Sequence, residues 1–422
     1  MTHNTGGHNL NEPLEQGTLS VLLLTKQSFA EPRDGGTMRT SSVHKELVQR
    51  GLHVTTVAVE SNDTVTDVHR VASMFSNLGP KVRVLSNYVR AGSVSSARWF
   101  RPSTVDRIVH ELAASTFDCV VVEYTQLMSY ASLFNSPVVL DMHNIESELL
   151  FNYAKSSKSV LRKMIAIYEG RRVAGLEHRL PSIVQLLSAV SPRDVEIAKS
   201  WSKASRNGTA KVVLAANGVS DGGFALEGKR NNDVVFVAHL GWQPNVDAAK
   251  WLVREVWPLV TSVNPNLQLR LIGRAPSPEV LALAGPRVLV EGDVPSVVEY
   301  VAAARVATAP LLAAGGTRLK ILEALSCGTP VVATSLGALG LESLAGPSLA
   351  IADSAPAFAS EILRLAATDI SRSLSRDLVD AYRWPTTLKE LGDEVEQLAS
   401  RHKNLSLSTA LTVTGTKRSE SS

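Results

Sequence analysis

The chain has 422 residues, which exceeds the usual size of one hydrophobic core and predicts two domains. Hydrophobic residues make up 44% and charged residues 20%, a balance typical of globular proteins and not of disordered chains. The formal net charge is only +3, which excludes a general nucleic-acid-binding protein, because any basic patch must then be local.

The ends of the chain and its cysteines bear on location. No apolar run reaches the ~18 residues of a membrane span. Residues 1–18 are polar and lack the apolar segment of a signal peptide, so we expect a disordered leader there. Residues 404–422 are rich in Ser, Thr and Lys and predict a disordered tail. Cys119 and Cys327 sit in apolar surroundings without metal-ligand spacing, as expected of reduced thiols in a cytoplasmic protein.

Strands and helices alternate in the first half of the chain. Short apolar runs predict strands at 19–25, 54–59, 119–123, 137–140, 183–191 and 212–215. Helical patterns occupy 37–49, the stretch through Met128 and Leu133, and much of 147–200. Gly35 and Gly36 fall in the loop after the first strand, and His143 directly follows the strand that ends near 140.

A polar, Gly-rich stretch at 221–232 predicts a linker, after which a second series begins. Strands are expected at 234–240, 267–272, 288–290, 306–309, 331–334 and 349–352, with helices at 245–260 and 297–304. Repeated strand–helix units predict an α/β protein with a mainly parallel sheet in each half, residues 19–222 and 232–400. Ligands of such sheets bind beyond the carboxyl ends of the strands.

The most informative stretch is 315–332, Gly-Gly-Thr-Arg-Leu-Lys-Ile-Leu-Glu-Ala-Leu-Ser-Cys-Gly-Thr-Pro-Val-Val. Gly315 and Gly316 allow a ligand to approach the backbone closely, and Thr317 can cap a helix whose first amides suit an anion. Arg318 and Lys320 add cations, although a separation of about 200° around a helix prevents both from meeting one phosphate from the same face. Glu323 could bind a diol, so the stretch predicts a nucleotide-sugar site.

These motifs resemble those of glycosyltransferase family 4, especially a bacterial branch of that family, and the two Rossmann-like halves resemble the GT-B fold. Besides the stretch above, the resemblance rests on Gly-Trp-Gln-Pro-Asn-Val-Asp-Ala at 241–248, Asp-Gly-Gly at 34–36 and Asp-Met-His-Asn-Ile-Glu-Ser at 141–147. It covers roughly residues 19–398 and is loosest between 61 and 115. It implies two Rossmann-like domains that face each other across a cleft, the second of which binds the donor.

The resemblance also assigns roles. Glu323 falls where the family's carboxylate binds the ribose hydroxyls of the donor. Gly315, Gly316 and Thr317 fall on the turn that faces the donor sugar and phosphates. Gly35 and Gly36 fall on a loop that approaches the donor or the acceptor, and His143 near a histidine close to the transferred sugar. A plain loop for the glycine pairs, a solvated helix residue for Glu323 and a structural role for His143 are the alternatives.

The chain departs from the family pattern in two places. Many members have a second glutamate eight residues before the first, where this chain has Gly315. Many also have an Arg and a Lys in the loop at 241–247, which here holds neither. Arg274, Arg318 or Lys320 could supply the missing positive charge.

The implied activity is a retaining, hexosyltransferase-type transfer from a nucleoside-diphosphate sugar to a hydroxyl of a saccharide, a lipid-linked molecule or a small molecule. The nucleotide sugar is the substrate and no cofactor is expected. The sequence has no Asp-x-Asp motif and no His or Cys cluster with ligand spacing, so no metal site is expected. A non-catalytic nucleotide-sugar-binding subunit and a nucleotide-sugar epimerase of the same fold are the alternatives.

The stretch at 153–172 mixes basic and apolar residues. Such a segment could rest on an anionic membrane, which would place the protein at the inner face of the membrane. A solvated cationic helix face is the alternative.

Overall fold

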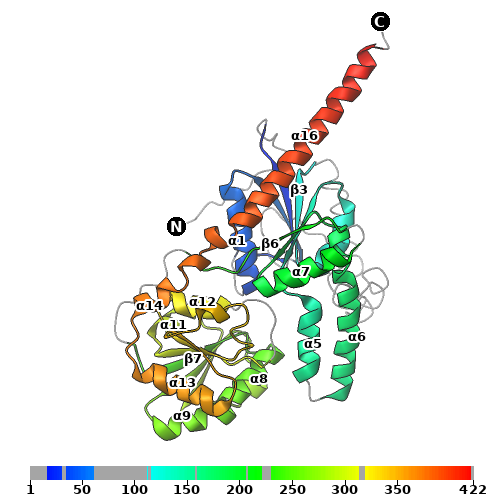
Figure 1. The fold of residues 1–422 in the computed structure, drawn as a ribbon. Coiled ribbons are helices and arrows are strands. Elements are labelled where there is room, and N and C mark those ends of the chain that lie inside the picture. Colours follow the sequence, from blue (N-terminus) through cyan, green and yellow to red (C-terminus); the bar gives the residue numbers. More distant parts are fainter. Residues whose placement is uncertain are drawn as a thin grey trace. The chain divides into compact units, whose positions relative to one another are not determined.

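The computed structural model describes residues 17–30, 35–60, 112, 116–156, 159–205, 208–220, 230–312 and 319–419. Their contacts divide the chain into two compact units, each with one six-stranded sheet (Figure 1). Unit 1 comprises Met1–Ser147, Tyr168–Ala215 and Leu388–Ser422, and unit 2 comprises Glu148–Ile167 and Ala216–Thr387. The expected leader, apart from residues 17 and 18, and most of the expected linker lie outside the described residues.

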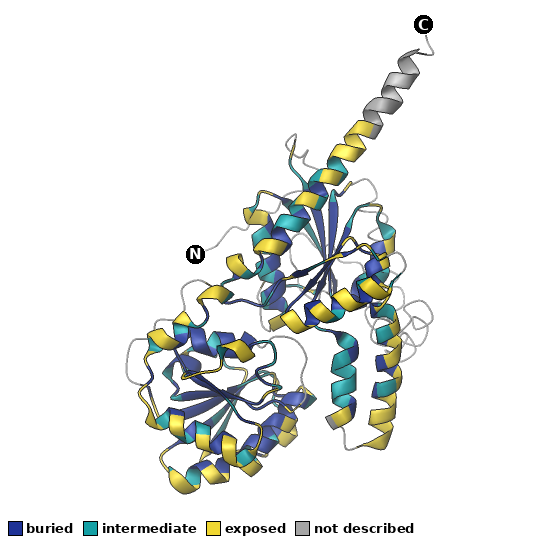
Figure 2. Cartoon of the chain, viewed as in Figure 1, coloured by how far each residue is buried: buried dark blue, intermediate teal, exposed yellow. Residues whose placement is uncertain are grey.

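The sheet of unit 1 is entirely parallel and has the strand order β2-β1-β3-β4-β5-β6. Strands β3, β4 and β5 are buried along their whole length, which explains why they read as continuous apolar runs (Figure 2). The strands are β1 (Ser20–Gln27), β2 (His53–Glu60), β3 (Cys119–Glu123), β4 (Val138–Met142), β5 (Leu186–Ala189) and β6 (Lys211–Leu214).

Helices complete the layers of unit 1. One core cluster joins Leu22, Val120 and Leu140 of the sheet to Leu127 and Trp201 of the helices. The boundary between the units runs through α5 and α6. The helices that lie wholly or partly in unit 1 are α1 (Gly35–Gln49), η1 (Thr125–Leu133), α5 (Glu146–Ser156), α6 (Val160–Glu177), η2 (Leu180–Ser182), α7 (Pro192–Ala204) and α16 (Lys389–Ser419).

The sheet of unit 2 is also parallel, with the strand order β12-β11-β10-β7-β8-β9. Alternate residues of β7 face two different cores, Val234 and Phe236 on one side and Val235 on the other. The sheet is therefore covered on both faces. The strands are β7 (Asp233–Val237), β8 (Gln268–Gly273), β9 (Val288–Gly292), β10 (Val306–Ala309), β11 (Val331–Ala333) and β12 (Leu349–Ile351).

The helix expected at 245–260 contains a π-helical turn, η3, between α8 and α9. Pro258 lacks an amide hydrogen and lies in the first turn of α9, so the wider turn before it accommodates its ring. The helices are α8 (Gln243–Trp251), η3 (Leu252–Val256), α9 (Trp257–Val263), α10 (Pro278–Leu281), α11 (Val298–Ala303), α12 (Leu319–Ser326), η4 (Glu342–Leu344), α13 (Ala355–Ala367), α14 (Arg372–Asp377), η5 (Asp380–Tyr382) and α15 (Trp384–Thr387).

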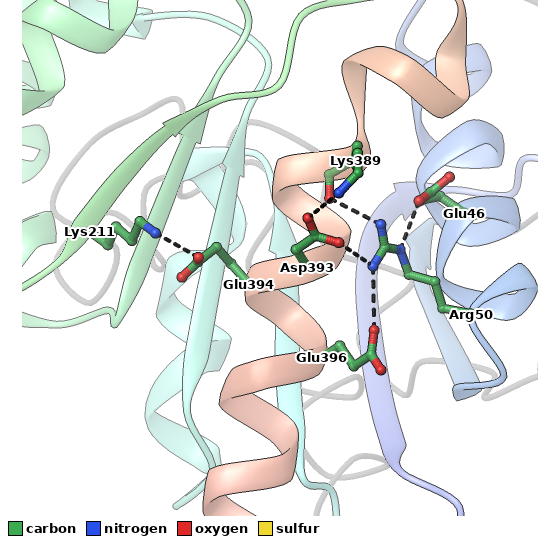
Figure 3. A network of polar contacts seen from close by, with 7 residues as sticks. All are labelled: Glu46, Arg50, Lys211, Lys389, Asp393, Glu394 and Glu396. Atoms are coloured by element: carbon green, nitrogen blue, oxygen red, sulfur yellow. Dashed lines mark hydrogen bonds and ion pairs between the residues drawn. The ribbon is translucent and has the colours of Figure 1, made fainter.

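Helix α16 returns to unit 1 and is held there by charged side chains (Figure 3). Arg50, which directly follows α1, pairs with Asp393 at 2.7 Å and with Glu46 of α1 at 2.8 Å. Lys211 of β6 pairs with Glu394 at 2.6 Å. Contacts of α16 with both α1 and β6 make the helix part of this unit.

These observations confirm the expected α/β class with two parallel sheets. They differ from the expected boundaries at the end of the chain, because residues 388–400 group with unit 1 and α16 continues to Ser419 where a tail was expected. Pairing with Arg50 and Lys211, distant in the sequence, accounts for the first difference. That the two sheets face each other across a cleft stays a prediction. No helix in the described part of the chain is long and apolar enough to cross a membrane.

We predict that Arg50→Met lowers the free energy of unfolding by about 1–2 kcal/mol, since the Arg50 guanidinium is mostly buried and joins α1 to two carboxylates of α16. Urea denaturation measures the change, and faster hydrogen exchange in α16 locates it. Lys211→Met is the control, because its more exposed ion pair should contribute less than about 0.5 kcal/mol. Equal effects of the two substitutions would contradict the assignment.

Candidate functional site

Buried polar side chains gather at the carboxyl edge of the unit 1 sheet. Strand β3 ends at Glu123 and β4 contains Asp141, and both carboxyl groups are fully buried. Arg39 of α1 donates from Nε to Asp141 Oδ2 at 2.8 Å and from Nη2 to Oδ1 at 2.6 Å. This paired geometry is the strongest form of carboxylate recognition and attaches α1 to the end of β4.

Asp141 carries the negative charge of the cluster. Burial alone would raise its pKa, but the positive charge and hydrogen bonds of Arg39 hold the pKa below its usual value, with help from His143 and the hydroxyl of Ser188. Asp141 is therefore ionised at neutral pH, and its charge is balanced inside the protein.

Glu123 behaves in the opposite way. Burial and the neighbouring charge of Asp141 raise its pKa to about 8. The hydroxyl of Thr40 donates to Oε2, while Oε1 has no hydrogen-bond partner among the described residues. Glu123 is consequently protonated at neutral pH, next to the ionised Asp141.

His143 lies directly after β4, over this pair of carboxyl groups. Its Nε2 is 3.7 Å from Asp141 Oδ2 and 4.0 Å from Glu123 Oε1. The ring also packs against Tyr124, with centroids 3.8 Å apart and planes inclined by 33°. Tyr124 has a φ of 75°, a conformation unusual for a residue other than glycine and typical of functional sites.

Lys26, near the end of β1, also contacts the Tyr124 ring. Its Nζ lies 3.8 Å from the centre of the Tyr124 ring. Burial lowers the pKa of Lys26 to about 8, against the opposing effect of Glu146 and Glu123. A cation, an aromatic ring and an imidazole thus lie together where β1, β3 and β4 end.

Glu123, Asp141 and His143 offer ligand atoms within 4.8 Å of one another, which is a spacing that a metal ion could use. Arg39 already occupies both oxygens of Asp141, so a divalent cation would compete with a fixed positive charge. The cluster is better suited to orienting His143 than to holding a metal.

The second edge of interest lies in unit 2. Strand β7 is the first strand of its sheet in chain order and lies between β8 and β10. The chain adds β8 and β9 on one side of β7 and then returns to the other side, where β10, β11 and β12 follow. The order of strands therefore reverses between β7 and β10, and such a switch point leaves a crevice beyond the carboxyl ends of the strands. The segment that follows β10 leads into α12.

Two of the expected site residues lie on α12. Lys320 is half-buried, and its Nζ is 5.0 Å from the centre of the Phe236 ring on β7, which places the start of α12 at the switch point. Glu323 is half-buried one turn further on. Burial raises the pKa of Glu323, and the neighbouring Lys320 opposes this shift.

Arg274 follows β8, the other neighbour of β7. Gly273, just before it, has a φ of +148°, and a Cβ there would lie 1.7 Å from the carbonyl oxygen of Ala238. Only glycine permits this approach of the two strand ends. The amide of Leu240 donates to the carbonyl of Arg274 at 2.9 Å, so Arg274 is fixed at the same edge as α12.

The other expected residues fall as follows. Gly35 and Gly36 lie in the first turn of α1, so the prediction that they belong to a loop is wrong. The carbonyl of Gly36 accepts a hydrogen bond from the Thr40 hydroxyl at 3.1 Å. Gly315, Gly316, Thr317 and Arg318 lie outside the described residues. The sequence analysis did not identify Lys26, Arg39 or Glu123. For Lys26 and Glu123 a signal was present, because each is a charged residue at the end of an apolar strand.

We predict that Arg39→Met destabilises unit 1 by about 3–5 kcal/mol, because it leaves the buried charge of Asp141 without the guanidinium that balances it. The double variant Arg39→Met/Asp141→Leu should recover much of this loss, since it removes both charges. Urea denaturation of both variants and of Asp141→Leu alone completes the cycle. A loss in the double variant equal to the sum of the losses in the two single variants would show that the pair is not coupled.

The raised pKa of Glu123 should make the stability of the protein depend on pH. A carboxyl whose pKa is raised on folding stabilises the folded state fully below the unfolded value of 4.5, and this contribution is lost as pH rises through about 8. Wild type should therefore lose stability relative to Glu123→Gln between these limits, by up to about 1.4 kcal/mol per pH unit. Unfolding free energies of the two proteins at several pH values measure it, and a constant difference across this range would refute it.

Comparisons with known proteins agree with this arrangement. Residues 231–368 match the family model described as Glycosyl transferases group 1. No curated protein matches the chain.

Among solved structures, a trehalose-phosphate synthase from Burkholderia xenovorans has a TM-score of 0.63 at 10% identity and covers 90% of this chain and 100% of its own. The pneumococcal O-GlcNAc transferase GtfA, solved with UDP and GlcNAc, has a TM-score of 0.51 at 15% identity, over 69% of this chain and 59% of its own. A mutant of S. aureus TarM, solved with UDP, has a TM-score of 0.54 at 12% identity, over 70% and 58%. The chain thus spans less than two thirds of the last two proteins.

The likeness to these structures concerns the fold, and the family match concerns unit 2. The fold likeness agrees with the two parallel sheets. The matched residues 231–368 include β7, β10 and α12, which form the switch point. The chain therefore has the GT-B fold, and residues 231–368 in its unit 2 are similar to the group 1 glycosyltransferases.

Proposed function

We propose that the protein is a retaining glycosyltransferase that moves a hexose from a nucleoside-diphosphate sugar to an acceptor hydroxyl. The observation that carries this proposal is the placement of Lys320 and Glu323 at the switch point of unit 2, inside the region that matches the family model. A cation and a carboxylate one turn apart on one helix suit a phosphate and a hydroxyl pair of the same ligand.

The diphosphate of the donor needs positive charge, and we assign it to Lys320 and Arg274. Their helices and loops follow β10 and β8, the two strands that flank β7. The loop after β7, which carries cations in many family members, holds neither Arg nor Lys at 241–247. Arg318 and the backbone of Gly315, Gly316 and Thr317 stay predicted contributors to the same site.

Glu323 is assigned to the ribose of the donor. Its side chain is half-buried and its pKa is raised, because burial removes part of the hydration of the carboxylate. A pair of ribose hydroxyls could donate to such a carboxylate and restore its solvation. This gives the site a reason to prefer a nucleotide over inorganic diphosphate.

The chemistry follows from where charge develops. Breaking the glycosidic bond of the donor leaves negative charge on the departing diphosphate, which can accept the proton of the attacking hydroxyl. Cations fixed at that position stabilise the transition state more than the ground state. We assign His143 to the transferred sugar, and its support by Asp141, Glu123 and Tyr124 would limit the orientations of the ring. Gly35 and Gly36 would bring the start of α1 close to a substrate.

The acceptor is proposed to be a saccharide, a lipid-linked molecule or a small molecule. We place the protein in the cytoplasm, with a peripheral contact to the inner face of the membrane. The transfer is proposed to proceed without a metal ion, because positive side chains would replace it at the diphosphate.

Calorimetry with UDP, GDP, ADP and dTDP, and with their sugars, tests this proposal in the presence of a chelator. One nucleotide class should bind to the wild type, and Glu323→Ala should weaken its affinity roughly tenfold or more, since a charged hydrogen bond to ribose is lost. Glu342→Ala, which removes an exposed carboxylate of the same unit, is the matched control and should leave the affinity unchanged.

Affinity that survives Glu323→Ala would contradict the assignment of this residue. Binding without turnover of any donor and acceptor pair would favour a non-catalytic nucleotide-sugar-binding subunit. Binding that requires a divalent cation would contradict the metal-independent site.

A further inference from the structure

Helix α6 has an exposed apolar face. Five large apolar side chains in its first half are exposed by more than half of their surface, which is uncommon for a folded protein. They are Val160 (73%), Leu161 (68%), Met164 (64%), Ile165 (58%) and Tyr168 (58%).

These side chains share one side of the helix. At about 100° per residue they fall within an arc of roughly 140°. The buried residues of α6 fall on the opposite arc and attach the helix to the rest of the protein; they are Ala166, Glu169, Gly170, Val173 and Glu177. The apolar face is therefore additional to the packing face and plays no part in holding the helix in place. Figure 2 shows exposed residues along α6 in yellow.

The charges that surround this face all have one sign. Arg162 and Lys163 lie on either side of the apolar arc. Arg171 and Arg172 lie on the same side of the helix as the apolar residues, about one turn after Tyr168. The two acidic residues of α6, Glu169 and Glu177, are buried, so no exposed carboxylate offsets the basic side chains on this helix.

We propose that this face of α6 docks on an anionic lipid surface. The apolar side chains would enter the boundary between headgroups and acyl chains, and the basic side chains would bind the acidic headgroups. Tyr168 combines an apolar ring with a polar hydroxyl, as is common at such boundaries. The inference specifies the peripheral location that forms part of the proposed function, and it is independent of the donor chemistry.

A second copy of the chain fits this face less well. A two-fold interface would place the face against itself, so that Arg162, Lys163 and Arg171 would approach the same residues of the partner. Like charges opposed across an interface oppose association. A bilayer with acidic lipids supplies the opposite charge as well as the apolar layer.

Sedimentation of the full-length chain with vesicles tests the proposal. Vesicles of phosphatidylcholine alone are compared with vesicles that contain about 30% phosphatidylglycerol, at low and at high salt. The wild type should bind the anionic vesicles, and high salt should weaken the binding. Leu161→Ser/Met164→Ser/Ile165→Ser should reduce the partition coefficient at least about tenfold, because it removes most of the apolar area.

A charge variant, Arg162→Gln/Lys163→Gln/Arg171→Gln, should lose the preference for anionic vesicles and its dependence on salt. The matched control is Leu259→Ser/Val263→Ser, which removes exposed apolar side chains from α9 and should bind as the wild type does. Circular dichroism and nucleotide affinity are measured for each variant, so a failure of the donor site is recognised separately from a failure of lipid binding.

Three results would overturn the proposal. The first is the absence of wild-type binding to anionic vesicles at low salt. The second is equal binding by the wild type and the Leu161→Ser/Met164→Ser/Ile165→Ser variant. The third is a wild-type dimer in sedimentation velocity that this same variant converts to a monomer while neither protein binds vesicles. That outcome would assign the face to a second copy of the chain.

Discussion

The common direction of the strands is the constraint on which both candidate sites depend. In a parallel sheet every carboxyl end lies at one edge, so side chains from strands far apart in the sequence meet there. In unit 1 this edge brings together Lys26, Glu123 and Asp141, and in unit 2 it brings together Arg274 and the start of α12. The buried interiors of the sheets leave little room for polar groups elsewhere, which concentrates the chemistry at these edges.

The polar cluster of unit 1 shows how a buried charge can serve orientation. An ion pair taken out of water adds little net stability, because desolvation offsets most of the attraction. Arg39 and Asp141 instead fix the relation between α1 and β4, and Asp141 in turn raises the pKa of Glu123. His143 then lies over one ionised and one protonated carboxyl group, a more defined electrostatic setting than solvent would provide.

The sequence predicted the strands well, because each buried strand is a short apolar run that needs no distant information to recognise. It also placed His143, Arg274 and Glu323 beyond strand ends or on the following helix. It could not predict the pairing of Arg39 with Asp141 or the return of α16 to Arg50, since these partners are 102 and 343 residues apart. The start of α1 at Gly35 was missed for a local reason: two glycines lower helix propensity, and tertiary packing overrides it.

The proposed donor site lies at the carboxyl edge of the unit 2 sheet, between β7 and β10. Hydrogen exchange of the full-length chain, with and without the nucleoside diphosphate selected by calorimetry, is the decisive experiment for this site. A nucleotide bound there should slow exchange at the start of α12 and in the segments that follow β7 and β8. Protection confined to unit 1, or to the opposite edge of the unit 2 sheet, would contradict this placement.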